Sequence, residues 1–348
     1  MKLTTTTAPR SSVHRFPARL LGYAAWGYAL VVIAACAVMY LLGDRWWPAT
    51  MLLFSPRWLI AIPLVMLVPL ALWLNRRLLL PLLLSALVIL GPFMGLQFSF
   101  GRAKTPHENI VRVITCNINN GTFDVKALRA LILETGADVL ALQECPRDIA
   151  PMLDLPGWQH VQESDLAVLS RFPVQKGGLM SSIDPLHGWP RGVAMQVLVK
   201  TPFSDLVLCS VHLTSPRYGL QHVLDRQRLV NPAKSAMLTD ETVRRWQTAL
   251  QVQKMVASLN LPVIIAGDLN MPTASAIYRA AWSNYANAFS RVGNGYGWTV
   301  RGDVRGIPVR VRIDHVLTGK GLVPRVCEVG PDVGSDHLPV IADVGFGR

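Results

Sequence analysis

The chain has 348 residues, more than one compact domain usually needs, and 51% of them are hydrophobic while only 16% are charged. The net charge of +12 is spread unevenly, because residues 1–100 hold eight Lys and Arg against one acidic residue. Residues 101–348 hold 26 Lys and Arg against 21 Asp and Glu. This composition is too apolar for an ordinary soluble protein, and a net +5 in the second part neither requires nor excludes a nucleic-acid-binding face.

Three apolar runs fill the first hundred residues, at about 20–43, 58–74 and 78–100. Each approaches the roughly 20 residues that a helix needs to cross a bilayer, and none contains a charged residue. A cleaved signal peptide is the alternative for the first run, but that run exceeds the about 7–15 apolar residues of a signal peptide and two more runs follow. We predict a membrane anchor at 1–100 with three transmembrane helices.

The orientation of this anchor follows from the placement of Lys and Arg. Four basic residues precede the first run, and Arg76 and Arg77 in the second loop would share their side. Four basic residues would lie on the opposite side: Arg45, Arg57, Arg102 and Lys104. We predict a multi-pass protein of the cell (inner) membrane, with a cytoplasmic N-terminus and an extracytoplasmic C-terminal domain. Loss of the second span, which is the shortest, would reverse this orientation.

Short apolar strands and a few helices alternate from residue 109 onward. Strands are predicted at 110–116, 138–142, 166–169, 192–199, 205–211, 262–265, 312–317 and 338–344. Asp124 caps a predicted helix that Gly136 ends, and an amphipathic helix is predicted at 240–259. This mixture indicates one α/β or α+β domain over residues 101–348.

Six polar clusters each stand at the end of a predicted strand, where a sheet can bring side chains to one point. They are Asn117, Glu144, His212, Asp268 with Asn270, Asp314, and Asp336 with His337. The carboxylates suit a hard divalent cation such as Mg²⁺ or Mn²⁺, whereas a zinc site would be expected to recruit more His or Cys.

The sequences of these clusters and their order along the chain resemble the motifs of the endonuclease/exonuclease/phosphatase superfamily, which includes DNase I and the inositol polyphosphate 5-phosphatases. The matching pieces are CNIN, LQE, LSRFPV, VHL, GDLN, IDHV and SDHLP, and they extend over about residues 111–343. The resemblance implies an α/β (α+β) four-layer sandwich, with two packed mixed β-sheets flanked by helices, here preceded by three transmembrane helices. It also implies a metal-dependent hydrolase of phosphoester bonds.

Residue roles follow from the same resemblance. Glu144 is expected to be the principal metal ligand, Asn117 to help hold metal or phosphate, and Asp336 to be a second acidic group near the metal. The expected catalytic residues are five: Asp268 to deprotonate the attacking water, Asn270 to hold the phosphate, His337 paired with Asp314 to donate to phosphoryl oxygens, and His212 to stabilise the transition state.

Two arginines flank strands that should end near the site. Either Arg191 or Arg217 could hold a second phosphate or a lipid headgroup, because a guanidinium matches phosphate with two hydrogen bonds. The alternative for each is a solvated loop arginine. The cysteines leave two alternatives as well: free thiols, which we favour, or a disulfide between Cys116 and Cys145.

The substrate is the least constrained prediction. The chain has Val311-Arg312-Ile313-Asp314-His315 where inositol phosphatases have a Trp-x-Asp-Arg element, and no DNA-intercalating aromatic loop is recognisable. A three-span anchor holds the active site near lipid-borne substrates, and the chain resembles the VanJ-like members that act on undecaprenyl pyrophosphate. We expect a phosphatase or phosphodiesterase acting on a lipid-linked phosphate. An exported nuclease and an inactive phosphate-binding module are the alternatives, and no protein partner is indicated.

Overall fold

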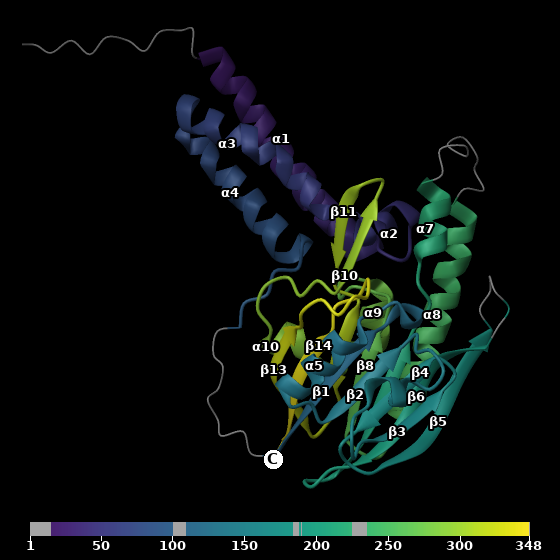
Figure 1. The fold of residues 1–348 in the computed structure, drawn as a ribbon. Helices are drawn as coiled ribbons and strands as arrows, with labels where there is room; N and C mark the ends of the chain where they lie inside the picture. Colours follow the sequence, from purple (N-terminus) through teal and green to yellow (C-terminus); the bar gives the residue numbers. More distant parts are fainter. Residues whose placement is uncertain (1–14, 100–108, 184–187, 189, 225–234, 348) are drawn as a thin grey trace, which may run out of the picture. The chain divides into compact units, whose positions relative to one another are not determined.

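The computed structural model describes residues 15–99, 109–183, 188, 190–224 and 235–347 (Figure 1). The chain forms two compact units. Met1–Leu41 and Arg57–Gly95 form the helical unit, and Leu42–Pro56 and Leu96–Arg348 form the α/β unit. The division therefore differs from a single boundary at residue 100, because Leu42–Pro56 belongs to the α/β unit.

The helical unit consists of apolar helices. Its elements are α1 (Arg15–Leu42), a 3₁₀ turn (Arg57–Ala61) leading into α3 (Ile62–Leu74), a second 3₁₀ turn (Arg76–Leu78) leading into α4 (Leu79–Val88), and a π-helical turn (Ile89–Phe93). Three stretches are long and apolar enough to cross a membrane: Phe16–Leu42, Arg57–Leu74 and Arg76–Phe93. They match the three predicted spans, although the third ends at Phe93, and residue 100 lies outside the described residues.

Two six-stranded mixed sheets form the centre of the α/β unit. The first has the order β13-β14-β1-β2-β4-β3 and the second has the order β5-β6-β7-β8-β12-β9. Strands β1 and β2 are parallel, as are β7 and β8, and the other pairs are antiparallel. The strands of the first sheet are β1 (Ile110–Asn117), β2 (Val139–Gln143), β3 (Gln159–Glu163), β4 (Leu166–Ser170), β13 (Leu322–Val329) and β14 (Val340–Phe346). Those of the second are β5 (Val174–Ile183), β6 (Pro190–Lys200), β7 (Asp205–His212), β8 (Val263–Asp268), β9 (Ala286–Asn287) and β12 (Asp314–Thr318).

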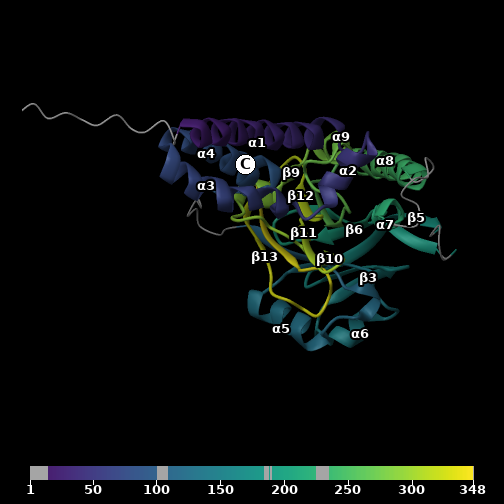
Figure 2. The ribbon, with the colours of Figure 1, turned by 90° about the horizontal axis from the view of Figure 1, so that it is seen from above.

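Helices cover the outer faces of both sheets, which gives four layers (Figure 2). Helices α5 (Val125–Thr135) and α6 (Ile149–Leu153) pack on the first sheet, and α8 (Ala236–Ala257) and α9 (Ala276–Trp282) pack on the second. Shorter elements are α2 (Trp47–Phe54), a 3₁₀ turn (Asn119–Gly121), α7 (Arg217–Leu224), α10 (Ala288–Val292) and a separate hairpin of β10 (Val300–Val304) and β11 (Ile307–Val311). The predicted two-sheet sandwich flanked by helices is confirmed.

Side-chain alternation explains why both faces of a central strand are apolar. In β1, Val111 and Val113 point into the core between the sheets, while Ile114 and Cys116 point toward the helices on the outer face. Each such aliphatic side chain contributes roughly 1.5–3 kcal/mol when it leaves water, so a strand buried on both faces is apolar throughout.

Local signals set the ends of α5 as predicted. The Asp124 carboxylate accepts hydrogen bonds from the backbone N–H groups of Lys126 and Ala127. Gly136 follows the helix with φ +64°, a left-handed conformation that glycine adopts without steric cost. The cysteines are all free thiols, and Cys116 and Cys145 form no disulfide.

Several elements were not predicted. They are β3, β5, β9, β13, the β10–β11 hairpin and the helices α2, α6, α7, α9 and α10. The strand predicted at 312–317 begins only at Asp314, and the one predicted at 262–265 extends to Asp268. The first difference makes Asp314 the first residue of its strand, and the second makes Asp268 the last residue of β8.

Candidate active site

Strand register brings the predicted site residues together from both sheets. In the first sheet, Asn117 ends β1 opposite Gln143, so that Glu144 follows directly beside it. In the second sheet, His212 ends β7 opposite Asp268, and Asp314 begins β12 opposite the same Asp268. Because the two sheets pack face to face, these sets of polar side chains converge at one end of the sandwich.

Unusual backbone conformations accompany this end of the sheets. Gly267, directly before Asp268, has φ +148°, and a Cβ there would clash with the carbonyl of Val211 on the neighbouring strand. Glu144 and Asn270 have φ of +53° and +51°. Left-handed non-glycine residues are uncommon and cluster at functional sites, where the surrounding structure holds them.

Asn117 links the carboxylates of the two sheets. Its Nδ2 donates to Glu144 Oε1 at 3.0 Å and to Asp268 Oδ2 at 3.2 Å. Asn120 Nδ2 donates to the other oxygen of Glu144 at 3.1 Å. Amide donors therefore hold both carboxylates in place.

His337 forms an ion pair with Asp314 and lies near Asp268. Its Nδ1 is 2.9 Å from Asp314 Oδ2, and its Nε2 is 3.9 Å from Asp268 Oδ2. Burial opposes the charge on this ring, but Asp314 and Asp268 outweigh burial and raise the pKa of His337 to about 10. The ring is therefore an imidazolium at neutral pH, able to donate a hydrogen bond from Nε2.

The charge on Asp268 is poorly compensated. Burial and the neighbouring Asp314 raise the pKa of Asp268 to about 7, against the lowering effects of His337, Asn270 and Asn117. Within the described part of the chain, neither Asp268 nor Glu144 has an ion pair with Lys or Arg. This centre therefore carries more negative than positive charge.

His212 completes the centre from β7. Its Nε2 is 3.5 Å from Glu144 Oε1 and 3.6 Å from Asp268 Oδ2. Arg191 contacts the ring, with its Nη2 2.7 Å from Nδ1. Burial and then Arg191 lower the pKa of His212 well below its usual value, so the imidazole is neutral. The structure thus places Arg191 beside a candidate catalytic residue.

Asn270 differs from its expected role in what its amide contacts. Its Nδ2 donates to Asp268 Oδ2 at 2.9 Å and to the carbonyl of Leu213 at 2.8 Å, and its backbone N–H donates to Asp268 Oδ1 at 2.8 Å. Both amide hydrogens are used within the protein, and they orient Asp268. Donation to a phosphate would require one of these bonds to be released.

Asp336 forms an ion pair with Arg217. Its carboxylate is partly exposed and is 3.5 Å from Arg217 Nη2. The preceding Ser335 donates from Oγ to the carbonyl of Asn117 at 2.8 Å and accepts from the backbone N–H of His337 at 3.2 Å. Ser335 therefore ties the loop that carries His337 to the end of β1.

The donor set suits a divalent cation. Ligand atoms of Asp268, Asp314 and His337 lie within 4.8 Å of one another. An imidazolium already paired with Asp314 is a poor metal ligand, so we favour Glu144 and Asp268 as the ligands. Rotation of the Asn117 amide would turn its oxygen toward both carboxylates, which is favourable only with a cation between them. Oxygen donors and uncompensated negative charge fit Mg²⁺ or Mn²⁺.

Three residues near the site were missed from the sequence. Asn120 and Ser335 contact Glu144 and Asn117, and Asp165 lies 3.8 Å from Arg191. Asn120 directly follows the CNIN motif and Ser335 is the first residue of SDHLP, and those positions were the available signal. Asp165 carries no comparable signal, because it stands in a turn before β4.

A groove of about 410 Å³ extends from this centre. Its polar end is formed by Asn270, His337, Asp336 and Arg217. Its apolar wall comes from α2, α7 and the β10–β11 hairpin, through Phe54, Leu220, Leu224, Val300, Val304, Val309, Val311 and Ile313. The groove therefore joins an acidic, imidazolium-bearing centre to an aliphatic surface.

Comparisons with known proteins agree with this fold. Residues 114–337 match the model of the Endonuclease/Exonuclease/phosphatase family. A humanized D. rerio TDP2 with 14 mutations is 15% identical with a TM-score of 0.50, and the match covers 68% of this chain and 99% of that one. No curated protein sequence matches the chain.

Two bacterial structures are also similar. An endonuclease/exonuclease/phosphatase from Beutenbergia cavernae is 20% identical with a TM-score of 0.48, covering 69% of this chain and 72% of that one. A mannosyl-6-phosphatase from Bacteroides thetaiotaomicron is 17% identical with a TM-score of 0.49, covering 68% and 100%. The family match extends over more than half of the chain. The chain therefore belongs to the endonuclease/exonuclease/phosphatase family, whose members are metal-dependent phosphoester hydrolases.

Proposed function

We propose that this enzyme hydrolyses a phosphoester or pyrophosphate bond of an amphiphilic, membrane-resident substrate such as a lipid (pyro)phosphate. The observation that carries the proposal is the groove, whose polar end includes His337 and Asn270 of the catalytic centre and whose wall is aliphatic. A lipid phosphate has the same division, with a charged head and an apolar chain. The three apolar helices would hold the site at the bilayer, where such substrates are concentrated.

The chemistry requires in-line attack of water on phosphorus. Asp268, oriented by Asn270 and Asn117, would accept the proton of the attacking water. The imidazolium of His337 would donate from Nε2 to a phosphoryl oxygen, and Asp314 would hold the ring in that orientation.

Metal binding would fall to Glu144 and Asp268, with Asn117 between them. A bound Mg²⁺ or Mn²⁺ would supply positive charge to the phosphoryl oxygens as negative charge builds up on them. His212, neutral and within 3.6 Å of both carboxylates, could donate a hydrogen bond to the same group. Arg217 and Asp336 would border the headgroup at the mouth of the groove.

The test compares two substrates with the same head and different chains. Purified full-length protein with Mg²⁺ should hydrolyse a long prenyl pyrophosphate at a lower KM than a five-carbon one. Val309→Asp places a charge in the groove wall and should raise KM for the long chain only. Val323→Asp, on an exposed position of β13 outside the groove, is the matched control.

Three outcomes would count against the lipid proposal. Equal KM values for both chain lengths would remove the role of the groove. Robust cleavage of DNA without hydrolysis of lipids would favour an exported nuclease. Absence of turnover on every phosphoester, with metal bound, would favour a phosphate-binding module.

We further propose that all three apolar helices cross the membrane. Leu42–Pro56 and the sheets belong to one compact unit, so both lie on the same side of a bilayer. The chain between them, Arg57–Gly95, must then cross the membrane an even number of times, which supports crossing by both α3 and α4. With the N-terminal Lys and Arg in the cytoplasm, the α/β unit would be extracytoplasmic.

Labelling of single cysteines with an impermeant maleimide tests this orientation in intact cells. The exposed positions Arg45→Cys and Gln251→Cys should both react, and Arg76→Cys should react only after lysis. The four cysteines of the α/β unit are buried, and the unsubstituted protein is the control. Opposite reactivity of Arg45→Cys and Gln251→Cys would contradict the even number of crossings.

A further inference from the structure

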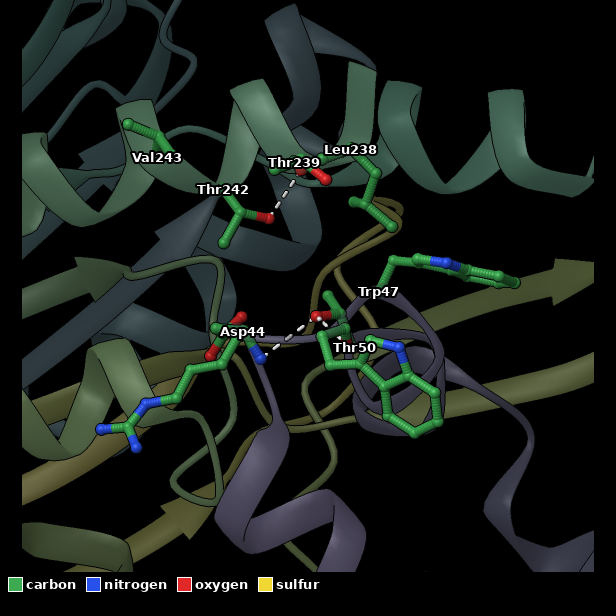
Figure 3. A pocket seen from close by; sticks show the side chains of 9 residues that line it. Asp44, Trp47, Thr50, Leu238, Thr239, Thr242 and Val243 are labelled. Atoms are coloured by element: carbon green, nitrogen blue, oxygen red, sulfur yellow. Dashed lines mark hydrogen bonds between the residues drawn. The ribbon is translucent and has the colours of Figure 1, made fainter. Parts of the chain in front are cut away.

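The segment Leu42–Pro56 follows the first apolar helix in sequence but is built into the α/β unit. Its attachment includes Asp44, whose backbone N–H donates to Thr50 Oγ1 at 3.1 Å. Figure 3 shows Asp44 and Thr50 facing the α8 side chains Leu238 and Thr242, which line the same pocket of about 140 Å³. The segment is therefore seated against α8.

Beneath this pocket lies a buried ion pair. Asp44 Oδ1 is 3.4 Å from Arg245 Nη1 of α8, and both side chains are fully buried. Ser275 Oγ donates a short hydrogen bond to Asp44 Oδ2. The guanidinium of Arg245 also lies over the ring of Phe54 at the end of α2, 5.7 Å from its centroid. Two side chains of the segment thus contact one arginine.

The other nitrogens of Arg245 reach the loops that carry the active site. Nε donates to the carbonyl of Thr214 at 3.1 Å, two residues after His212. Nη2 donates to the carbonyl of Asn270 at 2.9 Å. One guanidinium therefore connects the chain after β7 to the chain after β8, directly behind the catalytic centre.

This connection continues to the proposed general base. Asn270 donates to Asp268 from both its backbone N–H and its side-chain amide, and it holds a left-handed conformation at φ +51°. Release of the Asn270 carbonyl would relax that conformation and both bonds to Asp268. Displacements of about 1 Å in catalytic groups can lower rates on the order of 10²-fold.

Burial makes the stability of Arg245 depend on its pairing with Asp44. A buried arginine is costly unless its charge is balanced and its hydrogen bonds are made. Burial lowers the pKa of Arg245, and Asp44 opposes that effect. Removal of Asp44 would leave the buried cation without its ion-pair partner, which is strongly destabilising.

We propose that Asp44 and Arg245 are positioning residues for hydrolysis, and that Leu42–Pro56 is an integral part of the catalytic apparatus rather than a linker between membrane helices. Asp44 holds Arg245, and Arg245 sets the loops of Thr214 and Asn270 and hence the orientation of Asp268. Residues 101–348 alone would lack the partner of Arg245. The proposal rests on the contacts above and goes beyond the proposed function, because it holds for any phosphoester substrate.

The test separates positioning from stability with two full-length variants. Asp44→Asn removes the counter-charge, and the pair Asp44→Asn with Arg245→Met removes both charges. The double variant leaves no unpaired buried charge, so it should regain part of the thermal stability that Asp44→Asn loses. Its carbonyls at Thr214 and Asn270 would still lack their donor. We expect kcat to stay about tenfold or more below the wild type, with KM unchanged.

Hydrogen exchange supplies a readout without turnover. In the double variant, the amide of Leu213, which donates to the carbonyl of Asp268, and the amide of Asn270 should exchange faster than in the wild type, while amides of the β1–β2 pair should not change. Recovery of kcat together with stability would show a purely structural ion pair, and unchanged exchange at both loops would overturn the proposal. Because hydrogen exchange needs no substrate, the exchange result is distinguishable from failure of the proposed function.

Discussion

Two buried polar clusters in the α/β unit differ in their balance of charge. The cluster around Arg245 pairs one cation with one carboxylate, and the remaining polar atoms of both are hydrogen-bonded to Ser275, Thr214 and Asn270. The catalytic cluster contains three carboxylates, Glu144, Asp268 and Asp314, against one imidazolium, His337, and its other neighbours are amides and a neutral imidazole. A closed set of partners holds the surrounding loops in place, and uncompensated acidity indicates a site that awaits a cation and a substrate.

The largest expected effect is on turnover in the catalytic cluster. Glu144→Ala and Asp268→Ala remove a metal ligand and the proposed base, and each should lower kcat/KM on the order of 10³-fold. Phosphate release under Mg²⁺ measures this. Asp154→Ala, an exposed carboxylate in the same unit, should leave the rate unchanged. Wild-type rates in either active-site variant would remove these residues from the mechanism.

Stability should change in opposite directions in the two clusters. Asp44→Asn breaks the balanced pair and should lower the free energy of unfolding by roughly 3–5 kcal/mol. Asp268→Asn removes a carboxylate whose folded pKa is raised to about 7, so its charged form destabilises the folded state above that pH. That variant should gain roughly 1–3 kcal/mol at pH 8.

Urea unfolding in detergent with EDTA measures the free energy of unfolding of Asp44→Asn and of Asp268→Asn. Loss of stability in both would indicate that the catalytic cluster is as well balanced as the structural one. The catalytic cluster would then lack the uncompensated negative charge that favours metal binding.

Sequence reasoning found the clusters that stand at strand ends. Asn117, Glu144, His212, Asp268 and Asp314 follow or begin apolar strands, and strand register places such residues side by side. The four-layer fold was predicted through the resemblance that these motifs carry.

The structural cluster could not be predicted in the same way. Asp44 and Arg245 lie 201 residues apart, and no motif joins them. The available signal was weak: Asp44 is the single acidic residue among the first hundred. The apolar sequence of α2 also resembles the membrane runs beside it, which hides its place in the α/β unit. The β10–β11 hairpin was missed because its Gly, Pro and charged residues interrupt the apolar pattern.

A third buried polar group, His315, tests whether hydrogen bonds alone stabilise a buried titratable side chain as pH falls. Its Nδ1 contacts Asn287 and its Nε2 contacts the carbonyl of Met271. Burial and then Arg312 lower the pKa of His315 to about 3. The folded pKa is below the unfolded value of about 6.5. The contribution of neutral His315 to the free energy of unfolding is therefore fully present above pH ~6.5 and is lost as pH falls toward 3.

The expected slope from one such histidine is about 1.4 kcal/mol per pH unit. Unfolding free energies at pH 7, 6 and 5 should fall less steeply in His315→Gln than in the wild type. His212 is also buried and neutral, so some slope should remain. An identical slope in both proteins would show that His315 becomes charged without unfolding.

The smallest expected effect concerns Arg217 at the mouth of the groove. Its side chain is 58% exposed, and its ion pair with Asp336 is therefore screened by solvent. Arg217→Ala should raise KM for a lipid pyrophosphate by roughly two- to fivefold and leave kcat unchanged. A large loss of kcat would move Arg217 from the rim into the reacting centre.

The most direct test of the central claim is phosphate release from a long prenyl pyrophosphate by the full-length protein across a titration of Mg²⁺. We predict no release in EDTA, saturable activation by the metal, and loss of that activation in Glu144→Ala, which lacks the carboxylate that Asn117 holds. Release that continues at the same rate in EDTA, or metal activation that survives in Glu144→Ala, would contradict the account.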